Sequence, residues 1–356
     1  MRNAISLAEA GLIPDWLIRM GIRRLLAKRL SSRRSVDVAS FAKALQAGPL
    51  AIETQCANTQ HYEVDSNFFR FVLGPHLKYS SCLFRSPSTS LEDAETEMLR
   101  LTCERAEVAN GMHILELGCG WGSLTLWLAK NYPLSQITAV SNSHSQRIFI
   151  ERVAQERGLA NVRIITEDMR FFETKSKFDR IISVEMFEHM RNYSLLFARL
   201  ARWLAADGKA FVHVFCHKDT PYLFETEGDE DWMGRNFFTG GTMPSLDLFR
   251  YFDRDLSISK QWSIDGMHYW RTCEAWLTNA DRRRSDILAC FERELSRRDA
   301  KRVLQRWRMF FMACAELFRF RNGTEWFVAH YLMEHSHAGG RLEPNQEHLG
   351  AIQSSA

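Results

Sequence analysis

No two cysteines in this sequence are spaced C-x-x-C, although eight cysteines are present. That spacing is typical of structural zinc sites and of redox-active dithiols. Scattered cysteines instead fit the reduced thiols of a cytosolic protein. We therefore predict no metal site, no disulfide framework and a cytoplasmic location.

The chain also lacks a long apolar run and a strong excess of either charge. Glu9, Asp15 and Arg19 interrupt the apolar residues of the N-terminus, so the sequence predicts no signal peptide or stable membrane insertion. The net charge is only +3, which gives no reason to expect a nucleic-acid partner. The segment 23–34 is the one locally basic region. The basic amphipathic stretch from residue 1 to about residue 30 could form a helix that touches anionic lipid or one that packs on the protein. We favour packing, because apolar faces at helical spacing usually belong to a core.

The most informative stretch is H-I-L-E-L-G-C-G-W-G-S at 113–123, where an apolar run ends in closely spaced glycines. The pattern predicts a strand, a tight turn and a helix. Gly118, Gly120 and Gly122 allow sharp turns and let a ligand approach the first amides of the helix. Dinucleotide sites are typically spaced G-x-G-x-x-G. The shorter turn behind Glu116 suits a cationic nucleoside better, and it resembles the first motif of class I S-adenosylmethionine-dependent methyltransferases.

Strand-like and helix-like patterns alternate after this turn, which predicts an α/β fold with a doubly wound parallel sheet. In such sheets ligands bind at the carboxyl ends of the strands. The strands are expected at 112–117, 136–141, 162–166, 178–184 and 209–215.

Three segments before the sheet carry a more specific resemblance. They read H-Y-E-V-D-S-N-F-F at 61–69, L-K-Y-S-S-C-L-F at 77–84 and S-L-E-D-A-E-T-E-M-L at 90–99, where Ser90 and Asp93 predict a helix N-cap. Together they resemble the cyclopropane fatty acid synthase superfamily of class I methyltransferases. The sequence is most similar to its coclaurine-type members, the N-methyltransferases of benzylisoquinoline alkaloids. Matching motifs recur over 11–335.

The resemblance implies a Rossmann-like sheet with a helical N-terminal cap and a lid insertion. We expect the divisions to be a cap at 1–95, a donor-binding core at 96–216, a lid and substrate region with the final strands at 217–335, and a disordered tail at 336–356.

The resemblance also implies S-adenosyl-L-methionine as the methyl donor. The second strand ends without the acidic residue that binds ribose in many methyltransferases, but its neutral residues match the superfamily's T-x-S-x-x-Q segment. Gln146 taken alone would be read as a solvated helix position. The residues expected to hold the donor are Tyr79, Ser80, Glu116, Gly118, Gly120, Ser141, Asn142, Gln146, Asp168 and Met169.

The densest group of titratable side chains is V-E-M-F-E-H-M at 184–190, directly after a predicted strand. Amines are mostly protonated at neutral pH, with a pKa of about 10 by analogy with lysine, so their methylation needs a proton acceptor. We predict that His189 accepts this proton, that Glu185 attracts the ammonium group and that Glu188 orients the imidazole. Glu188 and His189 could instead simply cap a short helix, and their spacing alone does not decide between the two.

Two positions favour an amine over a lipid as the substrate. Lipid-modifying members of the superfamily carry a small residue in place of Glu185, and a bicarbonate-binding cysteine where this chain has Ser81. His213 and Tyr269 nevertheless match positions around that anion. The sequence therefore predicts N-methylation of a small aromatic amine, with methyl or methylene transfer to unsaturated phospholipid acyl chains as the alternative.

An acidic, aromatic segment at 225–238 is expected to form the lid. Aromatic faces attract cationic amines by roughly 0.5 to 2 kcal/mol each. We expect two or three of the following to touch substrate: Trp232, Phe237, Phe238, Trp262, Tyr269, Trp270 and Trp326. The expected partner is a small-molecule amine, and the sequence leaves open whether the protein is a homodimer.

Overall fold

The computed structural model describes residues 2–31, 36–52, 66–224, 226–228, 231–336 and 345–349. The predicted segment 61–65 and residues 225, 229 and 230 of the expected lid lie outside the described residues. The α-helices are α1 Arg2–Glu9, α2 Asp15–Ser31, α3 Val38–Gln46, α5 Ser66–Val72, α6 Leu91–Arg105, α7 Ser123–Asn131, α8 His144–Glu156, α9 Tyr193–Trp203, α10 Trp232–Asn236, α11 Gly266–Arg282, α12 Arg284–Phe291 and α13 Arg297–Phe318. Short 3-10 helices are η1 Phe187–His189, η2 Leu248–Phe252 and η3 Phe320–Gly323.

The strands are β1 His113–Leu117, β2 Gln136–Ser141, β3 Val162–Thr166, β4 Phe178–Val184, β5 Leu204–His217, β6 Tyr222–Leu223, β7 Thr242–Met243, β8 Leu256–Ile264, β9 Trp326–His335 and β10 Asn345–Leu349. Eight of them form one sheet in the order β10-β8-β9-β5-β4-β1-β2-β3. The five strands predicted from the alternation are the parallel part of this sheet, which confirms the α/β fold. Strand order reverses beside β1, so the carboxyl ends of β1 and β4 flank the crevice where ligands bind in this architecture.

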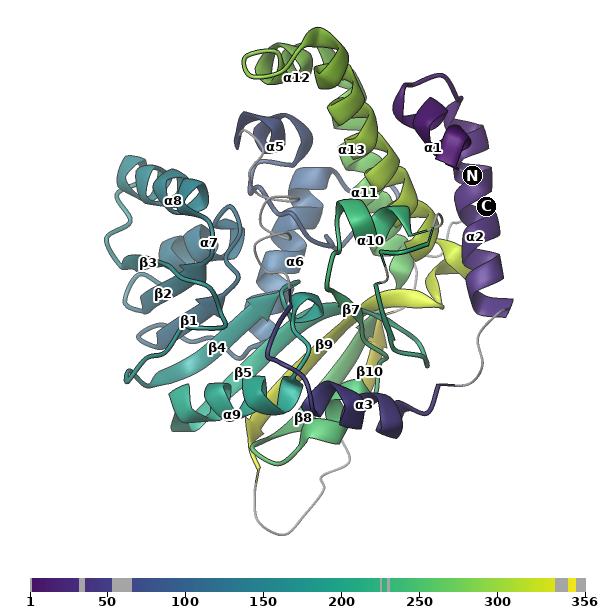
Figure 1. The fold of residues 1–356 in the computed structure, drawn as a ribbon. Coiled ribbons are helices and arrows are strands. Elements are labelled where there is room, and N and C mark those ends of the chain that lie inside the picture. Colours follow the sequence, from purple (N-terminus) through teal and green to yellow (C-terminus); the bar gives the residue numbers. More distant parts are fainter. Residues whose placement is uncertain are drawn as a thin grey trace.

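The helices cover both faces of the sheet (Figure 1). Ser90 accepts a hydrogen bond from the backbone N–H of Asp93 and caps α6, as the sequence predicts. On the other face α9 packs against β5 and α3. Although α3 belongs to the N-terminal region, it lies apart from α1 and α2, which stand beside α13 (Figure 1).

Ion pairs hold α2 against the long helix α13. Arg19 contacts Glu274 of α11 at 2.6 Å and Glu316 of α13 at 3.0 Å, and Arg23 contacts Glu316 at 2.6 Å. The side chain of Glu316 has no exposed surface. Removing either arginine would therefore leave the buried carboxylate of Glu316 with fewer positive partners. A buried charge that is poorly paired destabilises the folded protein. Helix α2 packs on the protein, as predicted for the amphipathic N-terminal stretch, and residues 32–34 of the basic segment lie outside the described residues.

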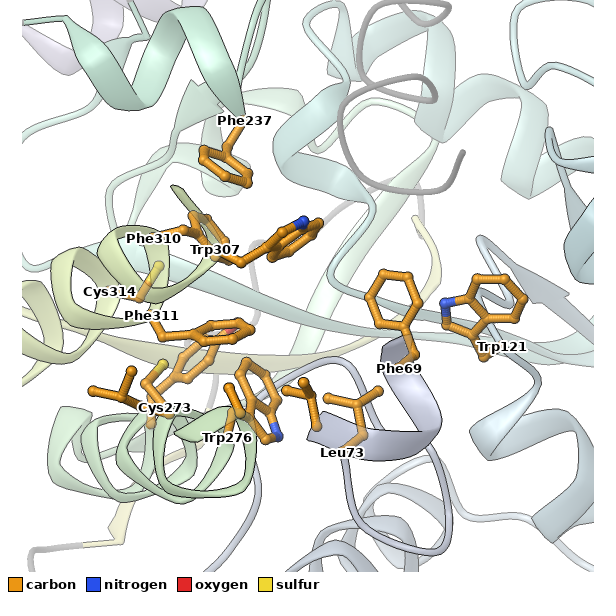
Figure 2. Close-up of a cluster of buried hydrophobic side chains, with 14 of the residues drawn as sticks. Phe69, Leu73, Trp121, Phe237, Cys273, Trp276, Trp307, Phe310, Phe311 and Cys314 are labelled. Atoms are coloured by element: carbon orange, nitrogen blue, oxygen red, sulfur yellow. The ribbon is translucent and has the colours of Figure 1, made fainter. Parts of the chain in front are cut away.

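A cluster of large side chains joins the helical layer to the sheet (Figure 2). Phe69 contacts Trp121 on one side and Trp307 of α13 on the other (Figure 2). Phe237 stacks on Phe310 of α13 at 4.1 Å between ring centroids, which fixes the end of α10. Such pairs contribute roughly 0.5 to 1.5 kcal/mol beyond the burial of their surface.

Strand β10 lies within the tail that we expected to be disordered. It pairs in parallel with β8, so the expectation is wrong for these five residues. The physical reason is the outer edge of β8, whose unpaired backbone groups can accept another strand. The sequence around 345–349 carries no strand pattern strong enough to predict this pairing. The other proposed divisions of the chain stay a prediction.

Candidate active site

The glycine turn connects β1 to α7 and has positive φ angles at all three glycines. A Cβ at Gly118 would lie 2.8 Å from the side chain of Met186, and one at Gly122 would lie 2.7 Å from Ile150. At Gly120 (φ +51°), by contrast, no atom lies within 4 Å of the Cβ position. Two glycines therefore permit close packing, and the third leaves room for a ligand beside the start of a helix.

Glu116 lies at the base of this turn and is buried. It accepts a hydrogen bond of 2.5 Å from the hydroxyl of Thr125 on α7. Burial raises the pKa of Glu116 to about 8, although the Thr125 hydrogen bond opposes the shift. The carboxyl group is therefore mostly protonated at neutral pH while no cation lies beside it.

Ser141 and Gln146 meet where β2 ends and α8 begins. The Ser141 hydroxyl donates to Gln146 Oε1 at 2.6 Å. Gln146 is 1% exposed, so it is not the solvated helix residue that its sequence alone would indicate. Its Nε2 has no hydrogen-bond partner among the described residues. Buried donors are almost always paired, so this amide is suited to an acceptor on a ligand. Asn142 is half-buried beside them.

Asp168 and Met169 follow β3, as predicted, but their surroundings differ. Asp168 accepts hydrogen bonds from the backbone and guanidinium of Arg170, at 2.8 to 3.1 Å. Met169 is 7% exposed and packs in the core with Leu117 and Val140. A contact of either residue with adenine stays a prediction.

A cavity of about 1240 Å³ lies next to the end of β4. Glu185, Glu188 and His189 all line it, together with Tyr79. Residues of α1, α2 and α13 form much of its apolar wall. Of the seven aromatic residues proposed for substrate contact, the three that line it are Trp232, Phe238 and Tyr269. The structure therefore brings the predicted catalytic residues together at a cavity larger than the roughly 300 to 1,000 Å³ of common ligand pockets.

Glu185 is the hub of the polar groups in this cavity. Its Oε1 accepts a hydrogen bond from the Ser81 backbone N–H at 3.0 Å and lies 3.2 Å from His213 Nε2. Its Oε2 accepts one from the Tyr269 hydroxyl at 2.5 Å. The residue has a φ of +48°, which a side chain rarely adopts unless the surrounding contacts impose it. These contacts aim the carboxylate into the cavity.

Glu188 and His189 belong to η1, directly after β4. Glu188 is 1% exposed, and its Oε2 has no hydrogen-bond partner among the described residues. Burial and the charge of Glu185 raise the pKa of Glu188 well above its ordinary value. Burial lowers the pKa of His189 to about 4. The N-cap of η1 is Met186, without a side-chain capping bond, so capping does not explain the acidic residue and the histidine.

Lys78 is a functional candidate that the sequence reasoning missed. It is 2% exposed, and burial lowers its pKa. Its Nζ donates to the carbonyl of Ser81 at 2.7 Å and to the hydroxyl of Ser80. It thereby fixes the segment whose amide reaches Glu185. The only signal for it in the sequence is a lysine within an otherwise weakly charged segment.

The sheet order, the glycine turn and the polar strand ends define a class I methyltransferase. The chain belongs to the mycolic acid cyclopropane synthetase family, whose model matches residues 51–326. The protein is thus an S-adenosylmethionine-dependent methyltransferase. Among the described residues, none of the helices combines the length and apolar character needed to cross a bilayer.

Named relatives fall into two groups. The chain is 37% identical to (S)-coclaurine N-methyltransferase of Thalictrum flavum subsp. glaucum, covering 92% of this chain and 93% of that one. It superposes on a crystal structure of coclaurine N-methyltransferase bound to N-methylheliamine and S-adenosylhomocysteine with a TM-score of 0.90, at 35% identity and covering 93% and 99% of the two chains. It is 30% identical to cyclopropane-fatty-acyl-phospholipid synthase of Escherichia coli K12, over 76% of this chain and 66% of that one.

The residues at the strand ends fit this donor. The open space at Gly120 and the unpaired amide of Gln146 provide room and a hydrogen-bond donor for a nucleoside. Lys78 donates to the hydroxyl of Ser80, one of the residues expected to hold the donor. The assignment of each side chain to a part of the donor stays a prediction.

Proposed function

We propose that this protein transfers the methyl group of S-adenosylmethionine to the nitrogen of a small aromatic amine, in the manner of the coclaurine N-methyltransferases. The observation that carries this proposal is the pair of carboxyl groups, one buried and one mostly buried, in a cavity whose walls are mainly apolar. Glu185 is held by three donors, while one oxygen of Glu188 has no partner among the described residues. A cationic ligand would compensate the buried negative charge.

The environment of each side chain suggests its role. Glu185 attracts the ammonium form of the amine and later stabilises the methylated ammonium product. Glu188 in its ionised form is the stronger base of the two neighbours, because its pKa is raised whereas that of His189 is lowered. The ammonium group of a bound amine would favour that ionised form. The sequence assigned the proton to His189, but a pKa of about 4 makes its imidazole a weak base. We therefore assign His189 to orienting the amine as a neutral hydrogen-bonding group.

These roles explain where the proton of the ammonium group goes and how the lone pair of the amine nitrogen becomes free to react. The bound donor supplies an electrophilic methyl group on sulfur. Transfer of one proton from the ammonium group to Glu188 frees the lone pair of nitrogen, which Glu185 and His189 hold toward that methyl group. The N–C bond would form as the S–C bond of the donor breaks, which leaves S-adenosylhomocysteine and a positive charge on nitrogen beside Glu185. The apolar walls of the cavity exclude water from this exchange.

The same geometry disfavours the lipid alternative. The resemblance to lipid-modifying enzymes implies an anion near the positions of Ser81, His213 and Tyr269. Here all three donate to the carboxylate of Glu185, which occupies the place of such an anion. A carboxylate also attracts an amine but offers little to an alkene. We expect a cytoplasmic enzyme with an alkaloid-like substrate, and we make no assignment of its oligomeric state.

Incubation with methyl-labelled donor tests the proposal. The panel contains benzylisoquinoline and simple tetrahydroisoquinoline amines, an aliphatic amine and vesicles of monounsaturated phospholipid. We expect labelled N-methyl products from the aromatic amines and no label in the acyl chains, both measured by mass spectrometry. Labelled acyl chains without N-methylated product would overturn the proposal in favour of lipid modification.

A further inference from the structure

Four buried side chains form a continuous hydrogen-bonded line that starts at Glu185. His213 Nε2 lies 3.2 Å from Glu185 Oε1, and His213 Nδ1 lies 2.8 Å from His330 Nε2. His330 Nδ1 lies 2.9 Å from Nη1 of Arg105. His213 and His330 face each other across β5 and β9 and are both 0% exposed.

The far end of this line is a residue that can only donate hydrogen bonds. Arg105 ends α6, is 7% exposed, and its guanidinium lies 4.8 Å from the ring centre of Trp262. A guanidinium carries no acceptor and keeps its charge in proteins. The nitrogen of His330 that faces Arg105 must therefore be the unprotonated one.

This single constraint sets every proton along the line. His330 then carries its proton on Nε2 and donates to His213 Nδ1. His213 in turn carries its proton on Nε2 and donates to Glu185. The opposite arrangement would direct an N–H of His330 at an N–H of Arg105, where no hydrogen bond can form. Glu185 is therefore an acceptor on this side, as it is toward Ser81 and Tyr269.

We propose that Arg105 and His330 are positioning residues that lock the tautomer of His213, so that Glu185 stays a hydrogen-bond acceptor and cannot pass the substrate's proton into the protein. Movement of a proton from Glu185 to His213 would require both rings to reverse, which Arg105 prevents. The proton of the amine must then leave through the Glu188 side of the cavity. The part of this inference that concerns the amine rests on the proposed function.

The charges around the two rings support neutral imidazoles. The titratable and charged groups around His213 are Glu185 directly after β4, His330 of β9, Arg105 of α6 and Lys78 of the segment before α6. Burial lowers the pKa of His213 to about 4, although Glu185 opposes this shift. Burial also lowers the pKa of His330, and His213, Arg105 and Lys78 lower it further. Each ring thus carries one proton near neutral pH, and its position is the only variable.

Nitrogen NMR of the full-length protein labelled with ¹⁵N-histidine tests the lock without any substrate. We expect both rings to show a protonated Nε2 and a bare Nδ1 from about pH 6 to 9, the span in which an ordinary histidine titrates. Signals are assigned by their loss in His213→Asn and His330→Asn. A protonated Nδ1 on either ring of the unsubstituted protein would overturn the proposal.

Two substitutions of Arg105 separate positioning from packing. Arg105→Lys keeps a side chain that only donates, whereas Arg105→Gln offers both a donor and an acceptor. We expect Arg105→Gln to populate the reversed tautomers and to lower kcat for amine methylation on the order of 10- to 100-fold, the range for losing a group that orients a functional histidine. Arg105→Lys should retain the tautomers and more of kcat. The affinity for the donor should stay unchanged in both.

The outcomes distinguish this inference from the proposed function. If both rings show the predicted tautomers but the unsubstituted protein methylates no amine, the proposed function fails. The inference that Arg105 and His330 fix the tautomer of His213 is then still supported. If Arg105→Gln folds, binds the donor and keeps the wild-type kcat and pH profile, the positioning role is wrong. Equal loss of kcat in Arg105→Lys and Arg105→Gln with unchanged tautomers would also contradict it, since packing alone would then explain the loss.

Discussion

The donor side and the acceptor side of the active site are built in different ways. The expected donor side lies at the ends of β1 and β2, with Gly120, Ser141 and Gln146 close together in the chain. The acceptor side collects Ser81, Glu185 and Tyr269 from segments far apart in the sequence. Local turns thus suffice for a nucleoside, whereas a buried carboxylate needs donors from several elements.

The electrostatics of the two sides differ as well. Near the donor turn, Glu116 is the main buried acid, and its pKa of about 8 leaves it mostly neutral. In the acceptor cavity Glu185 and Glu188 lie close enough that the charge of one raises the pKa of the other. Changes on the acceptor side should therefore alter chemistry, and changes on the donor side should alter binding.

The largest effect is expected for His189→Ala. Loss of a side chain that orients the reacting groups can cost about 10²-fold in rate, so kcat for amine methylation should fall by about that factor. Because the pKa of His189 is about 4, its imidazole is neutral at all working pH values, and the loss should be similar from about pH 6 to 9. Steady-state rates measured across this range decide it, with the exposed His113→Ala as the control. A loss confined to low pH would instead make His189 the proton acceptor.

A smaller effect is expected at the cavity wall formed by α2. Burial opposes ionisation of Glu316, but hydrogen bonds from Arg23 and Arg19 outweigh it, so the pKa of Glu316 is lowered. Arg19→Ala should loosen α2 and raise KM for the amine about tenfold, or about 1.4 kcal/mol. The affinity for the donor, measured by calorimetry, should not change. Arg100→Ala, which removes an exposed ion pair on α6, should change neither value.

Substitution of Glu116 should have a smaller effect, on thermal stability, and this effect should depend on pH. The folded-state pKa of Glu116, about 8, lies above the ordinary 4.5, so the folded protein keeps a proton that the unfolded chain releases. Stability from this group is complete below about pH 4.5 and is lost as the pH rises toward 8. Glu116→Gln should therefore gain in Tm over the unsubstituted protein between pH 5 and 8, values chosen within about that window. A Tm difference that stays constant would contradict the buried, neutral acid.

Glu107 provides a control with the opposite sign. Burial opposes the shift, but Lys209 and Lys260 lower its pKa to about 2. Stability from Glu107 is present above its ordinary 4.5 and is lost only as the pH falls toward 2. Glu107→Gln should thus lower Tm by a similar amount throughout the same window.

We expect that the protein does not bind to anionic vesicles at physiological salt. Trp16 and Met20 of α2 are 66% and 53% exposed. Arg23, however, forms an ion pair with Glu316 and is therefore less able to bind anionic lipid. Basic residues near a bilayer contribute only about 1 kcal/mol each, over a short range. Cosedimentation that is salt-sensitive and is abolished by substituting Arg23, Arg24 and Lys28 would contradict this and revive the lipid alternative.

Most of the donor side could be predicted from the sequence, because it depends on local patterns. Alternating strands and helices gave the parallel sheet, and the glycine spacing gave the turn. The three residues of 184–190 were also found, since they lie within five positions of one another. Their roles were harder to predict, because the depressed pKa of His189 depends on burial by distant elements.

Arg105, His330 and Lys78 could not be found in this way. Arg105 and His330 are 225 positions apart and meet only when β9 inserts beside β5. Their side chains carry no local pattern that distinguishes them from other basic residues. Strand β10 was missed for a similar reason, since its pairing depends on an edge strand some eighty residues earlier.

The most direct test measures donor affinity and amine turnover in two variants side by side. Gly120→Val places a branched side chain in the open space at a positive φ, so donor affinity should fall sharply, whereas Gly158→Val has the same kind of backbone strain away from the site and serves as its control. Glu185→Ala should bind the donor normally but lose roughly 10²-fold in amine turnover, because the amine is no longer held toward the methyl group. We therefore predict that Gly120→Val mainly loses donor affinity and that Glu185→Ala mainly loses amine turnover. Wild-type donor affinity in Gly120→Val, or wild-type amine turnover in Glu185→Ala, would contradict it.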